Sequence, residues 1–141
     1  MPDSSDEEGK QSQDLRVMEI RVSAMPDVVP SLRTLAADLA MRLDFDLDAV
    51  EDLRMTVDEA CSLLVPAATD GELTCEFRWG PGRVEVNVTV LAGAPGLAQE
   101  DSLGWQLLTA LATSARRSVT PRDDGYLTRV ELVRECVTVA R

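Results

Sequence analysis

The residue best suited to chemistry in this sequence is Glu59, which lies in a helical segment. A glutamate can act as a general base when its carboxylate lies within hydrogen-bond reach of the proton that it takes. Apolar residues recur beside it at helical spacing, at Cys61 and Leu64, so the carboxylate belongs to a helix with a buried side. A lone glutamate on such a helix is also commonly solvated or paired with a basic neighbour, here Arg54 or Arg33. Both interpretations of Glu59 stay open at this point.

Three cysteines are the other reactive side chains, at Cys61, Cys75 and Cys136, and the sequence has no histidine. Their odd number and wide spacing indicate neither a disulfide framework nor a common zinc site. We therefore expect reduced, mostly buried thiols and no metal site. An oxidant-sensing role for Cys61 or Cys75 stays open, although burial favours structural thiols.

Length and charge limit the classes of function. A chain of 141 residues fits one domain, which can bury roughly two thirds of its unfolded surface. The net charge of −11 disfavours direct binding to nucleic acid, and it suits either basic partner surfaces or plain solubility. The N-terminus is acidic and no apolar run reaches the roughly 18 residues that span a bilayer, so we expect a cytoplasmic protein without membrane contact.

The hydrophobic pattern predicts an acidic, disordered tail over residues 1–14 and a domain over residues 15–141. Expected strands cover residues 16–24, 73–79, 83–91, 118–120 and 126–139. Expected helices begin after caps at Asp27, at Asp46 and at Asp101 or Ser102, the third running to about residue 116. The inner side of the second helix includes Leu47, and that of the third includes Leu103 and Ala115. This order predicts an α+β two-layer sandwich, with three helices on one face of a mainly antiparallel sheet.

One motif connects these elements to a known family. Residues 52–61, Asp-Leu-Arg-Met-Thr-Val-Asp-Glu-Ala-Cys, closely resemble the phrase that opens the nucleotide-site helix of RsbW-type anti-sigma factors and serine kinases. Residues 102–108 resemble the family's second glycine box and the helix behind it, and residues 125–132 resemble its closing strand. The chain thus resembles this family from about residue 16 to residue 133, with most similarity to its actinobacterial, UsfX-like branch. The resemblance implies the GHKL ATPase fold that histidine kinases and gyrase share.

The resemblance also implies a nucleotide site, in which Glu59 holds the position of the general base. The family's magnesium ligand is an asparagine four residues later, but this chain has Leu63, which offers no oxygen to the metal. Another turn on, where the family usually has a basic or imidazole residue, the chain has Ala67. The family's adenine-recognising aspartate is missing as well, because no aspartate stands between Gly71 and Glu100.

Three glycines keep parts of the family's two glycine boxes, and these are Gly93, Gly96 and Gly104. Each lost charged or metal-mediated contact is worth roughly 1.5 to 3 kcal/mol, so two losses imply binding of Mg-ATP at least about a hundredfold weaker. We therefore expect no bound cofactor, or only weak ATP and magnesium, and no useful kinase activity. A divergent pocket that still binds nucleotide is the alternative. Trp105 either plugs the vacated site or packs against the helix behind it.

The resemblance finally implies partners. Arg33 matches, by ungapped counting from Glu59, an arginine with which the family grips its sigma factor and its antagonist; a solvated helix-face arginine is the alternative. We place Asp38 and Arg42 in the same partner-binding patch. The expected function is a homodimeric anti-sigma factor that sequesters an alternative sigma factor of the stress or development class and releases it to a STAS-type anti-anti-sigma protein. The alternatives are an active serine kinase that phosphorylates an anti-anti-sigma factor, and a small dimeric adaptor.

Overall fold

The computed structural model describes residues 15–96 and 102–137. The disordered tail predicted over residues 1–14 lies outside them. In chain order the elements are the strand β1 (Arg16–Ser23), the 3-10 turn η1 (Pro26–Val28), α2 (Val29–Arg42), α3 (Leu47–Leu64), the 3-10 turn η2 (Val65–Ala67), β2 (Ala68–Gly80), β3 (Arg83–Ala92), α4 (Leu103–Leu111), β4 (Ser114–Arg122) and β5 (Gly125–Glu135).

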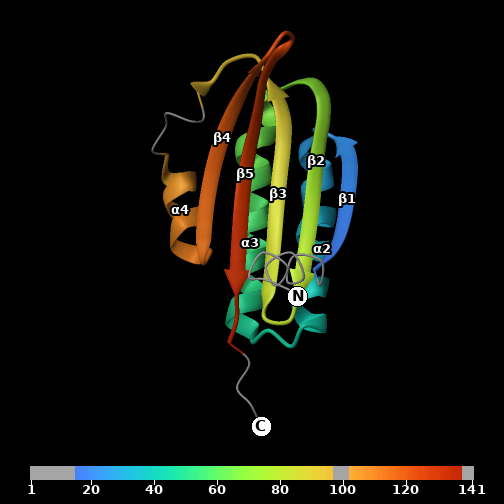
Figure 1. The fold of residues 1–141 in the computed structure, drawn as a ribbon, viewed down its shortest axis with the longest axis vertical. Coiled ribbons are helices and arrows are strands. Elements are labelled where there is room, and N and C mark those ends of the chain that lie inside the picture. The colour runs from blue at the N-terminus through green and yellow to red at the C-terminus, as the bar shows by residue number, and fades with distance from the viewer. Residues whose placement is uncertain (1–14, 97–101, 138–141) are drawn as a thin grey trace, which may run out of the picture.

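The strands form one antiparallel sheet in the order β1-β2-β3-β5-β4, so β1 and β4 are its edges. The three α-helices lie together behind this sheet, with α3 between α2 and α4 (Figure 1). Alternate residues of β3 are buried against the helices, and these are Val84, Val86, Val88 and Val90. The α+β two-layer architecture is therefore confirmed. Among the described residues, no helix is long and apolar enough to cross a membrane.

Two of the three predicted helix caps are present. The Ala49 amide donates a hydrogen bond to the Asp46 carboxylate (2.8 Å), and the Trp105 amide donates to the Ser102 hydroxyl (3.1 Å). The prediction for Asp27 is wrong, because this residue lies in η1 and α2 starts at Val29 without a side-chain cap. Pro26, directly before Asp27, is the first residue of this 3-10 turn and fixes its own φ.

The third helix is shorter than predicted. It ends at Leu111, and the expected helical residue Ala115 lies instead on β4, opposite Leu132 of β5. The Thr113 amide already donates to the Val133 carbonyl (2.7 Å), so pairing with β5 replaces the helical hydrogen bonds from this point. Strand β4 is correspondingly longer than the predicted residues 118–120, and β5 ends before the predicted residue 139.

Two leucines predicted on buried helix faces are exposed instead. Leu47 is 75% exposed and Leu103 is 82% exposed. Each is the first residue of its helix, where the chain has only just turned toward the core. Cys61 and Leu64 of α3 are buried as the sequence predicts, and Val50, Leu53 and Val57 lie in the core with them.

Candidate functional site

The candidate site lies where α3 faces α4, and Glu59 is its central residue. A Cβ atom built on Gly104 would overlap the Glu59 Oε1 atom, and it would lie 3.3 Å from Leu63 Cδ2. The backbone of the first turn of α4 therefore rests directly on these two side chains, in a place where no larger residue fits unless they move. The structure thus joins three of the predicted pocket residues in one contact.

This contact places a carboxylate at the N-terminus of α4. Ser102 is the N-cap, so Gly104 belongs to the first turn, where backbone amides lack partners within the helix. The helix dipole makes such an end favourable for negative charge, and helix N-termini commonly bind phosphate groups for the same reason. In this chain the Glu59 carboxylate lies beside Gly104 in this first turn, and the Trp105 amide donates to the Ser102 hydroxyl.

The basic neighbours expected for Glu59 pair with other acids. Arg33 donates from Nη1 to Asp58 Oδ1 (2.9 Å), and Arg54 donates from Nη1 to Glu51 Oε1 (2.9 Å). The salt-bridge interpretation of Glu59 through either arginine is therefore wrong. Its contact with α4 takes the place of that ion pair.

Leu63 and Ala67 lie at the border of the hydrophobic core and pack against it. Trp105 packs there as well, and the Arg117 guanidinium lies 4.5 Å from the centroid of its ring, at the distance of a cation-π contact. Trp105 thus contacts the border of the core and Arg117 of β4, and the two interpretations of this residue stay predictions.

The other glycines predicted for the pocket have different surroundings. A Cβ on Gly93 would meet Thr69 Cγ2 at 3.4 Å, and a Cβ on Gly96 would meet nothing within 4 Å. Both glycines are exposed, beyond the end of β3. Neither of them shows the close approach that Gly104 makes to Glu59.

The residues predicted to form one partner-binding patch form two separate ion pairs. Arg33 extends from α2 toward Asp58 on α3, whereas Arg42 donates from Nε to Asp38 Oδ2 (2.8 Å) on α2 itself. At about 100° per residue, Asp38 and Arg42 lie roughly 140° and 180° around the helix from Arg33. A single patch of all three residues therefore does not form on this monomer.

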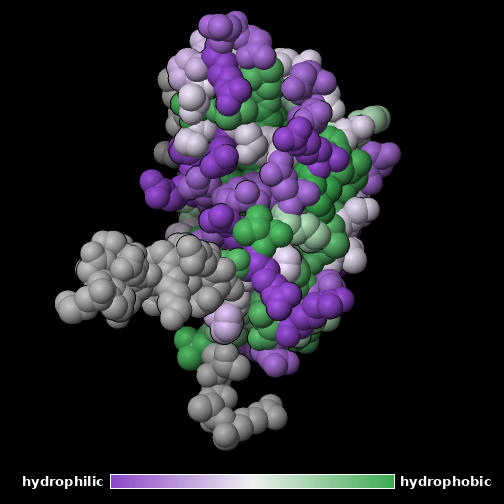
Figure 2. Space-filling model, turned by 45° about the vertical axis from the view of Figure 1, so that its right-hand side comes forward, coloured by the Kyte–Doolittle hydropathy of each residue, from purple (hydrophilic) through white to green (hydrophobic). Residues whose placement is uncertain are grey.

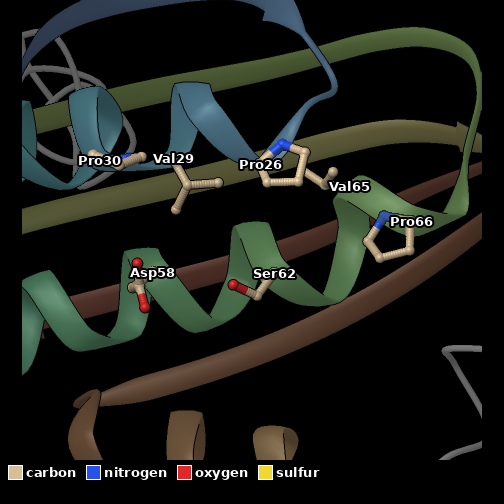
Figure 3. Close-up of a pocket in the computed structure, with 7 residues that line it drawn as sticks. All are labelled: Pro26, Val29, Pro30, Asp58, Ser62, Val65 and Pro66. Carbon is tan, nitrogen blue, oxygen red and sulfur yellow. The ribbon is translucent and has the colours of Figure 1, made fainter.

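Sequence reasoning missed a pocket on the other side of α3. It has a volume of about 290 Å³ and lies between the start of α2 and the end of α3 (Figure 3). Asp58 and Ser62 line it from α3, and Pro26, Val29 and Pro30 line it from η1 and α2. A signal was present, because Asp58 and Ser62 are polar residues four positions apart, next to the apolar stripe of this helix.

The described residues contain no cluster of three or more metal-ligating side chains. Cys61 and Cys75 are buried, as predicted. Burial, with a smaller contribution from the Asp58 charge, raises the pKa of the Cys61 thiol to about 12, and burial raises the pKa of Cys75 further still. Both thiols therefore stay protonated at neutral pH, which fits structural thiols and not reactive ones.

No family model matches the chain, but curated proteins do. The anti-sigma-F factor RsbW of Mycobacterium tuberculosis is 36% identical over an alignment of 105 residues. This alignment covers 70% of this chain and 59% of that protein. Over this stretch the chain is similar to RsbW-type proteins. The serine-protein kinase RsbW of Bacillus subtilis is 33% identical over 75 residues, 50% of this chain and 47% of that protein. The chain spans about half to three fifths of the length of these RsbW proteins.

Solved structures support the fold of this chain. The SiaB-SiaC complex from Pseudomonas aeruginosa gives a TM-score of 0.70 at 10% identity, over 94% of this chain and 98% of that chain. The RsbU and RsbW domains of Rv1364c from Mycobacterium tuberculosis give 0.67 at 18% identity, over 89% of this chain and 34% of that chain. The expected GHKL-type fold is confirmed.

Proposed function

We propose that this chain is a cytoplasmic anti-sigma factor that sequesters an alternative sigma factor and releases it to an anti-anti-sigma protein, without kinase activity. The observation that carries the proposal is the sequence similarity to RsbW, an anti-sigma-F factor by name, combined with the close contact of Gly104 with Glu59 and Leu63. RsbW relatives named serine-protein kinases make ATP a possible ligand of the family. The question is whether this chain's own residues suit it.

The residues around Glu59 do not fit Mg-ATP. Leu63 offers no oxygen to a metal, and its side chain packs against the core. The first turn of α4 lies against Glu59 and Leu63, so closely that a Cβ atom added at Gly104 would overlap the Glu59 carboxylate. These features support sequestration without nucleotide chemistry.

Complex formation with a sigma factor tests the proposal. The purified chain is mixed with each alternative sigma factor of its own genome and analysed by size-exclusion chromatography with light scattering. We expect one stable complex, which an anti-anti-sigma protein dissociates. A chain that binds none of these sigma factors would overturn the proposal.

An active serine kinase is the second candidate, because Glu59 still holds the position of the general base in the resemblance. The matching assay follows transfer of labelled phosphate from ATP to an anti-anti-sigma protein. Transfer that is absent in Glu59→Ala and present in the wild-type chain would establish the kinase. We expect no transfer by either protein.

We further propose a homodimer that forms through the β1 edge of the sheet. This edge has no neighbouring strand among the described residues, and Val17, Met25 and Met41 are exposed there and on the adjoining α2. Figure 2 turns this side toward the viewer and shows hydrophobic surface along its right half. Exposed edges and apolar surface favour pairing between copies. Val17→Glu should lower the dimer fraction in analytical ultracentrifugation, and an unchanged mass would contradict this interface.

A further inference from the structure

The pocket between α2 and α3 lies on the side of α3 that faces away from α4. Asp58 and Ser62 lie on successive turns of α3, and Val29 and Pro26 face them across the opening (Figure 3). Most of the lining is apolar, with Val65 and Pro66 closing one end. At about 290 Å³ the pocket is slightly below the usual range of roughly 300–1,000 Å³ for ligand sites, so it suits one or two side chains and not a cofactor.

Polar groups at the rim would select what enters the pocket. Asp58 accepts from Arg33 through Oδ1, and a carboxylate has further acceptor positions, including Oδ2. Ser62 is exposed on the next turn and adds a hydroxyl group. An apolar side chain would therefore pack against the apolar walls, while hydrogen-bond donors on its neighbours would bind the Asp58 carboxylate and the Ser62 hydroxyl at the rim.

The charge around the pocket is uneven across the molecule. Residues 26–67, which form the helices α2 and α3, contain nine acidic residues and three arginines, a net charge of −6. The other described residues contain nine acidic residues and nine arginines, so they are neutral overall. The acidic character of the described chain is thus concentrated on α2, α3 and their adjoining turns, and Asp58 is the acidic residue among those that line the pocket.

This charge decides between possible occupants. The chain's own residues 1–14 contain five acidic residues and one lysine, and a second copy would bring another acidic helical layer. Like charges repel both of them from this surface, whereas a basic segment of another protein is attracted to it.

We propose that the α2–α3 pocket binds an aliphatic side chain from a basic segment of the protein partner. The proposal rests on the proposed function, since it takes that partner to be the sequestered sigma factor. The aliphatic side chain fills the pocket between Val29 and Val65, and its basic neighbours lie against the carboxylates of α2 and α3. Binding should accordingly weaken as the salt concentration rises.

A variant that fills the pocket tests this proposal. Ser62→Trp puts a large side chain into the opening from an exposed position, and Thr109→Trp adds the same side chain at an exposed position on α4. Thermal unfolding of both variants checks that they fold. We expect Ser62→Trp to weaken sigma-factor binding at least tenfold, and Thr109→Trp to change it less than twofold. A dissociation constant of Ser62→Trp within twofold of the wild-type value would overturn the proposal that the pocket binds the sigma factor, and it would leave the proposed function intact.

A second measurement does not need the sigma factor. Isotopically labelled protein is titrated with two synthetic peptides that share a central leucine, one flanked by arginines and the other by glutamates. We expect only the arginine-flanked peptide to shift the amide signals of Val29, Ser62 and Val65, and Ser62→Trp to abolish these shifts. Equal or absent shifts with both peptides would overturn the proposal. Peptide binding without any sigma-factor complex would retain the basic-segment pocket and reject the sigma factor as its partner.

Discussion

The contact between Glu59 and the first turn of α4 allows a sharp test by a double-mutant cycle. Gly104→Ala adds a methyl group that overlaps Glu59 Oε1 and approaches Leu63 Cδ2 to 3.3 Å. The Glu59 carboxylate must then leave the helix N-terminus, which costs about 0.3–1 kcal/mol, and repacking adds about 1–3 kcal/mol. The helix propensity of alanine offsets up to about 1 kcal/mol of this loss. We expect a net destabilisation of about 1–3 kcal/mol.

Removal of the Glu59 side chain should reverse the sign of the stability change that Gly104→Ala causes. In a Glu59→Ala background the overlapping atom is gone, so Gly104→Ala should be neutral or stabilise the protein by up to about 1 kcal/mol. Glu59→Gln is the matched control, because it keeps the shape of the side chain and removes its charge. The overlap, and with it most of the destabilisation by Gly104→Ala, should persist in that background.

Urea unfolding followed by tryptophan fluorescence gives the free energies of unfolding of all six proteins in the cycle. The coupling between Glu59→Ala and Gly104→Ala should be about 1–4 kcal/mol, the difference between these two effects. Additive effects, within about 0.5 kcal/mol, would mean that Glu59 does not support α4, and the account of the closed contact would fail.

Three further predictions concern the cap of α3 and the thiols. Asp46→Ala should lower the free energy of unfolding by about 1 kcal/mol in urea titrations, because it removes the acceptor for the Ala49 amide, and an effect below about 0.3 kcal/mol would contradict the cap. Cys61 and Cys75 should resist alkylation by iodoacetamide at pH 8 in the folded protein, while the less buried Cys136 reacts first; equal rates for all three would refute their burial. The pKa of Cys61 is raised from 9.0 to about 12, so between these pH values the unfolded protein loses a proton that the folded protein keeps. The free energy of unfolding should therefore keep the whole contribution of this thiol below pH 9 and fall by about 1.4 kcal/mol per pH unit above it. In a Cys61→Ala variant the free energy of unfolding should fall less steeply with pH.

The sequence predicted the helices and strands where local chemistry decides them. The alternation of valines along β3 and the caps at Asp46 and Ser102 depend on residues near in sequence, and the structure agrees with all of them. The end of α4 was missed because pairing with β5, a later segment, takes over from Thr113 onward. The cap predicted at Asp27 is wrong because this residue lies in a 3-10 turn that begins at Pro26.

The sequence predicts which residues belong to the candidate site, but it does not predict which of them are in contact. The family motif singled out Glu59, Leu63 and Gly104, and the structure brings these three together. Glu59 lies against α4 and not beside an arginine. This position depends on how α3 packs against α4, and more than forty residues of chain separate Glu59 from Gly104. The pocket beside Asp58 likewise requires α2 and α3 to meet, which no local pattern shows.

The affinity for the sigma factor, measured by calorimetry with and without Mg-ATP, tests the central claim most directly. The account predicts the same dissociation constant in both conditions, together with no detectable heat of Mg-ATP binding to the chain alone. A Leu63→Asn variant shows whether a restored metal ligand is enough to bring nucleotide binding back. Micromolar binding of Mg-ATP to the wild-type chain, or a sigma-factor complex that forms only with nucleotide, would contradict the account and favour the kinase.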